Sequence, residues 1–345
     1  MLAETIAASV IVKIFIGTAI ELGRIAVKDA KKVIKDEAEK KRYEKAAVEY
    51  SKNLLKLYGH VRVIGLNKPL PLEGVYTDVN ILSRPTGNIP LPEHLAEAIF
   101  LGKAKFGDVK EEDKGREGKE VLRKYDKLFI LGKPGAGKTT FLKHTMHQAI
   151  HGKLYDSPKR DVVPVFIELK KFSESELPIL DYIVEQFDIC RFTDAKPFIE
   201  KILTEGQVII LCDGLDEVMK EKRGKVIKDL TDLSNKYLEC PFIITCRIAA
   251  TDYSYEKFTY VEMADFNDQQ IDTFVKNWFT TEGDVVKSDG FLKEFNQAKN
   301  KRLREIARTP LLLAMMCLSY SEHQTFPSRH SQVYSQAIDA LLYKW

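Results

Sequence analysis

The stretch "GKPGAGKT", residues 132–139, matches the pattern G-x-x-x-x-G-K-[ST] at every fixed position. It follows an apolar run that predicts a strand at 127–131, and it opens a predicted helix at 139–150. Glycines allow the backbone to wrap a phosphate and turn its N–H groups toward the anion. We therefore expect a phosphate-binding loop in which the contacting residues are Gly132, Pro134, Gly135, Ala136, Gly137, Lys138, Thr139 and Thr140.

Two residues of this loop have specific expected roles. The Lys138 ammonium would contact the β- and γ-phosphates of a nucleotide, and the Thr139 hydroxyl would bind Mg²⁺. The sequence thus predicts ATP or ADP and Mg²⁺ as cofactors.

Three acids follow a second apolar run, "VIILCDGLDEV" at 208–218. Asp213 directly ends a predicted strand at 207–211, where it would hold Mg²⁺ opposite the loop. Asp216 and Glu217 would then lie near the γ-phosphate and activate the attacking water. The alternative is that these two acids cap the next helix and interact with its dipole.

The run "FIITCR" at 242–247 predicts another buried strand, which ends in Arg247. The carboxyl ends of parallel strands meet at the ligand edge of such a sheet. Arg247 is therefore a candidate for contacting the γ-phosphate, and the alternative is a surface arginine in an ion pair.

Strands and helices alternate along the middle of the chain, which predicts an α/β fold: a P-loop NTPase parallel sheet sandwiched by helices. Pro164 indicates that the strand at 161–169 lies at an edge or contains a bulge.

The chain is expected to be helical from residue 267 onward, and residues 3 to about 58 are expected to be helical, compatible with a helix pair. The predicted divisions are an N-terminal helical module (1–60), an adenine-side segment and charged linker with strands at 61–66 and 75–82 (61–126), the nucleotide-binding domain (127–264), a C-terminal helical domain (265–322) and the start of a further domain (323–345).

The composition of the chain restricts the partners, metal sites and cellular location that can be expected. The net charge of +3 over 345 residues is too small to indicate a nucleic-acid partner. None of the five cysteines forms a C-x-x-C pair, so zinc and disulfide frameworks are not indicated and a reducing cytoplasm is expected. Residues 6–20 are apolar but contain Lys13, which favours a helix buried in a bundle or a partner interface over a membrane span. Membrane association through this helix is the alternative.

Five segments in this order resemble the NACHT NTPases of the STAND class of signalling ATPases: "LGKPGAGKTTFLK", "LCDGLDE", "ITCR", "FNDQQIDTFVKNWF" and "IARTPLLLAMMCLSY". The resemblance covers about residues 75–345 and is closest to the bacterial subgroup. It implies that Pro310 packs against adenine and that Tyr76 and Thr77 line the base and ribose. It also implies a slowly hydrolysing switch that rests with ADP, is active with ATP, oligomerises, and serves innate or anti-phage defence with the N-terminal helices as effector.

In this family a winged helix and a sensor usually follow, and "FPSRHSQVYSQAIDALLYKW" resembles only the first helix of a winged helix. We expect such a chain to release ADP readily and to expose the apolar face of that last helix, which would favour self-association. The sensed ligand is not indicated.

Other classes are less consistent with the sequence. A small GTPase would need N-K-x-D after the loop, and an ABC ATPase would need a signature such as LSGGQ; neither is present. An AAA+-like ATPase that acts on nucleic acid remains an alternative, as does a membrane-active helical effector capped by an ATPase. The partners expected are other copies of the chain, through the nucleotide-binding domain, and an effector partner or a membrane for residues 1–60.

Overall fold

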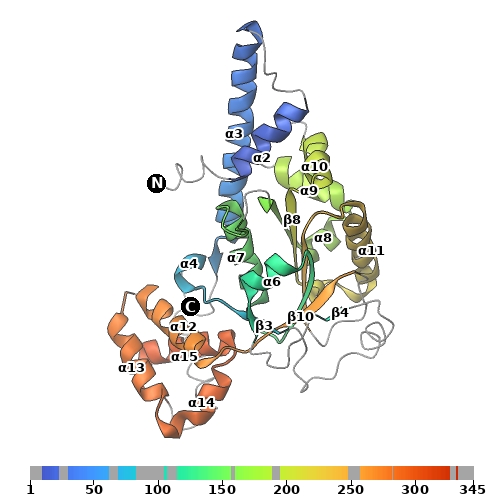
Figure 1. Ribbon diagram of the computed structural model, residues 1–345. Coiled ribbons are helices and arrows are strands. Elements are labelled where there is room, and N and C mark those ends of the chain that lie inside the picture. Colours follow the sequence, from blue (N-terminus) through green and yellow to red (C-terminus); the bar gives the residue numbers. More distant parts are fainter. Residues whose placement is uncertain are drawn as a thin grey trace.

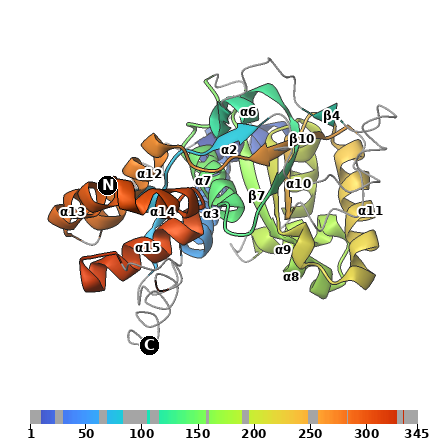
Figure 2. The same cartoon turned by 90° about the horizontal axis from the view of Figure 1, so that it is seen from below.

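The computed structural model describes residues 10–22, 30–61, 69–82, 105–106, 115–156, 160–188, 195–247, 257–281, 283–326 and 332, without the side chains of 30–36 and 105–106. At its centre these residues form an eight-stranded sheet (Figures 1 and 2). The strands run in the order β5 (Arg116–Glu117), β3 (Asn80–Leu82), β10 (Thr259–Met263), β6 (Lys127–Gly132), β9 (Phe242–Arg247), β8 (Val208–Asp213) and β7 (Val163–Glu168), with β4 (Lys105–Phe106) also beside β10.

The five strands from β10 to β7 are parallel, whereas β3 and β5 extend the sheet in antiparallel fashion. Helices lie on both sides of the sheet, as Figure 2 shows for α7 and α11. The predicted α/β class is confirmed. The helices of this part are α6 (Gly118–Lys124), α7 (Lys138–Ile150), α8 (Leu169–Ser175), α9 (Ile179–Asp188), α10 (Ala195–Thr204) and α11 (Lys220–Lys236).

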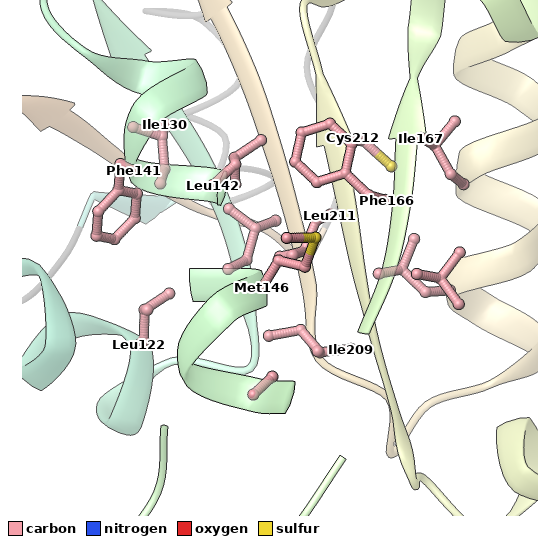
Figure 3. Close-up of a cluster of buried hydrophobic side chains, with 14 of the residues drawn as sticks. Leu122, Ile130, Phe141, Leu142, Met146, Phe166, Ile167, Ile209, Leu211 and Cys212 are labelled. Carbon is pink, nitrogen blue, oxygen red and sulfur yellow. The ribbon is translucent and has the colours of Figure 1, made fainter. Parts of the chain in front are cut away.

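The core lies between α7 and the sheet (Figure 3). Leu142 and Met146 project from α7 toward Leu211 of β8 and Phe166 of β7, and Phe141 lies on the other side of the helix near Ile130; all of these side chains are buried. Because α7 begins at Lys138, this packing fixes the helix that follows the phosphate-binding loop against the strands whose ends carry the predicted acids. The parallel strands are apolar along their length, as strands covered on both faces must be.

The N-terminal helices are α2 (Val10–Glu21) and α3 (Ala30–Tyr58), which pack against each other. Figure 1 shows α2 beside α3 and next to α10. Phe15 is fully buried, with its ring centroid 4.6 Å from that of Phe198 and 6.3 Å from that of Phe187. Lys13 is exposed, although most residues of this helix are buried. No helix among the described residues is long and apolar enough to cross a membrane.

Pro164 lies on β7, at the end of the sheet order, which confirms the predicted edge position. The neighbouring Val163 N–H donates to Gln207 O on the β8 side at 2.8 Å, so Pro164 faces away from β8. On that outer side the Tyr50 hydroxyl donates to the carbonyl of Pro164 at 2.9 Å. A helix therefore occupies the hydrogen-bonding position that another strand would take.

One local prediction is wrong. The strand predicted at 75–82 is shorter, because α4 (Leu72–Val75) and an extended segment precede β3. The helical character predicted for residues 3 to about 58, compatible with a helix pair, agrees with α2 and α3 where this region is described. Of the strand predicted at 61–66, only Val61 is described; it belongs to β1 (His60–Val61), which pairs with β2 (Leu70–Pro71).

The described chain after residue 267 is helical, as predicted. Its aromatic core surrounds Phe291, whose ring lies 4.9 Å from Phe326 and 5.2 Å from Tyr320 between centroids. The helix predicted near the C-terminus falls, apart from residue 332, outside the described residues. The elements of this part are α12 (Asp268–Thr281), α13 (Val285–Phe295), the 3-10 turn η4 (Ala298–Asn300), α14 (Lys301–Ile306) and α15 (Pro310–His323).

Candidate functional site

The loop between β6 and α7 forms a backbone cradle. Gly135 and Gly137 have φ angles of 74° and 90°, a left-handed conformation that side chains other than glycine rarely adopt. The following helix points its N-terminus at the cradle, so that N–H groups and the helix dipole favour an anion there. This is the local geometry that the sequence predicts for a phosphate site.

Lys138 is the cation of this cradle. Its Nζ donates to the carbonyls of Gly132 and Lys133 at 2.9 and 3.1 Å, which holds the loop closed upon itself. Burial lowers the pKa of Lys138, and the carboxylates of Asp216 and Asp213 oppose that shift. A half-buried ammonium whose hydrogen-bond acceptors in the described part of the chain are neutral carbonyls gains from a bound phosphate, because charge-assisted hydrogen bonds are the stronger ones.

Asp213 ends β8 and faces the loop. It accepts a hydrogen bond from the Thr245 hydroxyl at 2.8 Å and one from Thr139, yet burial still raises its pKa. Thr245 in turn accepts from the Gly214 N–H at 3.0 Å, which fixes the turn after the strand. Sequence reasoning missed Thr245; the signal was its place in "ITCR" on the strand adjacent to β8.

The oxygen donors of Thr139 and Asp213 suit Mg²⁺, which is held in proteins by few protein ligands and completes its shell with water and phosphate oxygens. Among the described residues there is no group of three or more His, Cys, Asp or Glu placed to hold a metal, so an all-protein metal cage is not what this part of the chain provides. An ion held with phosphate is the arrangement that fits.

Asp216 and Arg247 form a pair at the cavity. The Asp216 carboxylate accepts from the Arg247 backbone N–H at 3.0 Å and lies 2.9 Å from the Arg247 Nε. The alternative interpretation of Arg247 as an ion-paired arginine is therefore realised, but its half-exposed side chain also lines the cavity. Both residues thus line the same cavity as the phosphate loop.

Glu217 lies in the 3-10 turn η2 (Leu215–Glu217) together with Asp216. Helix α11 begins only at Lys220, with Met219 as its N-cap residue, so neither acid caps that helix. Partial burial raises the pKa of Glu217, and the negative charges of Asp213 and Asp216 raise it further. A carboxylate with a raised pKa is a better proton acceptor from water.

A second wall of the cavity is apolar and comes from two distant parts of the chain. The Tyr76 ring stacks on that of His144 from α7 at 3.6 Å between centroids and an interplanar angle of 5°. The Thr77 hydroxyl is buried and has no hydrogen-bond partner among the described residues. Pro310 opens α15, and the next residue, Leu311, donates its N–H to Gly135 O at 3.3 Å. The C-terminal helical region therefore contacts the phosphate loop directly.

The cavity between these walls has a volume of about 340 Å³, within the range of roughly 300–1,000 Å³ that is usual for small-molecule sites. All predicted site residues line it except Gly132, whose carbonyl binds Lys138 instead. Its remaining lining residues, which sequence reasoning did not identify, are Val61, Val75, Val79, Gly214, Thr245, Phe266, Phe274, Leu311 and Ala314. Most of them are apolar, so no chemical motif marked them.

Residues 126–282 match the family model of the NACHT domain. The chain contains a NACHT domain. The match begins just before β6 and extends through α12, so it includes the phosphate loop, the acids after β8 and Arg247. Tyr76, Thr77 and Pro310 lie outside the matched NACHT residues but on the same cavity. This part of the protein is a nucleotide-binding P-loop NTPase.

The solved structures that the chain resembles share little sequence identity with it. A Walker-type ATPase of Pyrococcus abyssi shares 12% identity over 65% of this chain and 68% of that one, with a TM-score of 0.38. Domain III of the replication initiation protein DnaA from Thermotoga maritima shares 16% identity over 65% and 87%, with a TM-score of 0.33. A STAND protein with a tetratricopeptide repeat sensor from Pyrococcus horikoshii shares 14% identity over 67% of this chain and only 32% of its own length, with a TM-score of 0.34. No curated protein matches the chain. The NACHT assignment rests on the domain match.

Proposed function

We propose that the protein binds ADP and Mg·ATP in this cavity and hydrolyses ATP slowly as a signalling switch. The observation that carries the proposal is the meeting, on one cavity, of a phosphate loop, an acid suited to Mg²⁺ and an apolar wall. Lys138 would leave its two carbonyl partners for the phosphates, and Val75, Tyr76 and Pro310 would enclose adenine. When bound, Mg²⁺ would neutralise phosphate charge beside Thr139 and Asp213.

For hydrolysis, Glu217 would accept a proton from water while the water oxygen bonds to the γ-phosphorus. The bond from that phosphorus to the β–γ bridging oxygen breaks, and inorganic phosphate and ADP leave. Arg247 would contact the transferring phosphoryl group, where positive charge stabilises the transition state. Asp216 keeps Arg247 in place, as its two contacts with that residue indicate.

We further propose that ADP maintains a resting state and that ATP promotes self-association through the nucleotide-binding domain, in innate or anti-phage defence. The support is the NACHT match and the half-exposed position of Arg247 at the phosphate end of the cavity. The N-terminal helices would act as effector. Their connection to the site is short, because Tyr58 at the end of α3 stacks on Phe166 at 4.3 Å between centroids and Val61 lines the cavity.

Calorimetry with ADP, ATP and GDP tests the binding step. Lys138→Ala should weaken ADP binding by about a hundredfold or more, the scale on which charge-assisted contacts act. Lys196→Ala is the matched control, because Lys196 lies exposed on α10 in an ion pair with Asp181. Equal ADP affinity in wild type and Lys138→Ala would refute the site, and preference for GDP would refute the assignment to adenine nucleotides. Light scattering with ATP and ADP tests self-association; the same mass with both would contradict the switch.

A further inference from the structure

Residues 74–78 form one wall of the cavity, and side chains from one face of α12 donate hydrogen bonds to the carbonyls of this segment. The Gln270 side chain donates through Nε2 to the Asp78 carbonyl at 2.6 Å, and the Asn277 side chain donates through Nδ2 to the Tyr76 carbonyl at 3.1 Å. One further turn along, Thr281 Oγ1 lies 2.9 Å from the Gly74 carbonyl and 2.8 Å from the Asn277 carbonyl, so its single proton is shared. Positions 270, 277 and 281 fall on the same side of a helix of 3.6 residues per turn.

The spacing of the acceptors matches that of the donors. Alternate carbonyls, those of residues 74, 76 and 78, are the ones that α12 binds. Between them, Val75 and Thr77 are buried and line the cavity. The segment thus presents its carbonyls to α12 and its side chains to the cavity, and it cannot shift along α12 without breaking these bonds.

Neither Gln270 nor Asn277 lines the cavity itself. Gln270 is buried, and its Oε1 also accepts from the Asn267 N–H at 2.9 Å while Asn267 Oδ1 accepts from the Gln270 N–H at 2.9 Å. This reciprocal pair is a capping box at the start of α12. The cap fixes the Gln270 side chain, so its remaining donor is aimed at Asp78.

The phosphate loop is held by different contacts. Its backbone is closed by Lys138 and docked by Leu311, and no hydrogen bond that α12 makes within the described residues reaches it. The two halves of the site therefore differ in their hydrogen-bond support: β6 and α15 hold the phosphate half and α12 holds the half that faces Tyr76 and Thr77, while α7 contacts both, through its N-terminus and through the His144 ring.

We propose that Gln270 and Asn277 are positioning residues that hold the wall against which the nucleoside of the bound nucleotide packs. The proposal rests on the proposed nucleotide binding. It predicts that loss of either donor weakens binding of the nucleoside part and leaves binding of the phosphate part unchanged, because the hydrogen bonds of α12 reach residues 74, 76 and 78 and, within the described residues, none reaches the phosphate loop. Replacing a donor also leaves a buried carbonyl without its partner, which costs more than the bond itself.

The test compares two probes, ADP and inorganic pyrophosphate, each with Mg²⁺, by calorimetry. Asn277→Leu removes the donor at similar volume and should weaken ADP binding by about tenfold, the effect of one lost buried hydrogen bond. Gln270→Glu keeps the acceptor that caps α12 but loses the donor to Asp78, and it should weaken ADP binding similarly. Gln269→Ala, exposed on the same helix, is the control and should bind both probes as wild type does.

The outcomes separate the hypotheses. Weaker ADP binding with unchanged pyrophosphate binding in both variants supports the positioning role. Unchanged ADP binding overturns it, and so does an equal loss for both probes, because that result would show a general loss of structure. Wild-type protein that binds pyrophosphate but not ADP would overturn the proposed nucleotide specificity instead. A melting temperature measured for each variant shows whether the fold is retained.

Discussion

Asp216 binds Arg247 at two points, the backbone N–H at 3.0 Å and the side-chain Nε at 2.9 Å. This pair joins the end of β9 to the turn η2, two elements that both border the nucleotide cavity. The Asp216 carboxylate oxygens are thus already engaged by Arg247, which leaves them less available to accept a proton from an attacking water. Its neighbour Glu217, with a raised pKa, is the acid better suited to activate water.

Glu217→Gln should therefore lower ATP turnover by roughly 10²-fold or more, the scale of a lost general base, while nucleotide affinity is retained. Asp216→Asn should lower turnover less, because the amide oxygen can still accept from Arg247. Phosphate release measured at saturating ATP gives both values. If Asp216→Asn abolishes turnover and Glu217→Gln does not, the two roles are reversed.

The pH dependence of turnover should follow the same acid. Only ionised Glu217 can accept a proton, so turnover should fall as the pH falls through its pKa. Because burial and the two neighbouring carboxylates raise that pKa above 4.5, the decline should occur at a higher pH than for an exposed glutamate. Asp216→Asn removes one of the negative neighbours and should move the profile to lower pH. A profile that stays in place would show that Asp216 does not influence Glu217.

The ionised Asp213 side chain should lower the folding stability of the protein when no cation is bound. Burial raises its pKa, so the folded state favours the protonated acid. The contribution of this group to folding stability is present at low pH and is lost as the pH rises through the raised pKa. Asp213→Asn should consequently raise the melting temperature of the nucleotide-free protein at pH 7.5 and weaken binding of Mg·ATP. A lower melting temperature in the variant would contradict this account.

Gly135 should tolerate no side chain. Its φ is 74°, and an added Cβ would lie 2.6 Å from the Leu311 Cβ. Gly135→Ala should therefore destabilise the protein by about 1–3 kcal/mol and weaken ADP binding, because the loop and the start of α15 must separate. Gly224→Ala is the matched control: this glycine lies within α11 with nothing within 4 Å of an added Cβ, so alanine should stabilise by about 0.5–1 kcal/mol. Chemical denaturation measures both changes.

The N-terminal helix α2 should contribute to the stability of the whole fold. Phe15 is fully buried among aromatic rings of α3, α9 and α10, and Phe15→Ala should cost about 3–5 kcal/mol. Ile20 on the same helix is 40% exposed, and Ile20→Ala should cost less than about 1 kcal/mol. Similar unfolding midpoints for Phe15→Ala and wild type would show that α2 is a separate unit.

The sequence predicted best where chemistry and local pattern coincide. The phosphate loop requires glycines at fixed spacing, so β6 and α7 were located to within one residue at each end. The placement of Asp213 at the end of β8 followed from the apolar run before it. Both features depend on short segments of chain, in which neighbouring residues decide the structure.

The errors arose where a distant element decides the structure. The segment 75–82 alternates like a strand, but its carbonyls at Tyr76 and Asp78 bind side chains of α12 instead of another strand. Thr245 contacts Asp213 only because β9 lies beside β8 in a particular register. The apolar wall of the cavity likewise combines residues that are more than 200 positions apart, such as Val75 and Pro310. No local pattern encodes these contacts.

The position of Pro164 has a consequence for aggregation. The outer edge of a sheet is a template on which a strand from another molecule can add, and natural proteins protect such edges. At Pro164 the outward donor is missing because proline has no N–H, and the outward acceptor is taken by the Tyr50 hydroxyl. Strand addition is therefore blocked near the start of β7, one of the most apolar segments of the chain. Tyr50 belongs to α3, so the N-terminal region also helps to prevent fibre-like association of the nucleotide-binding domain through the edge of its sheet.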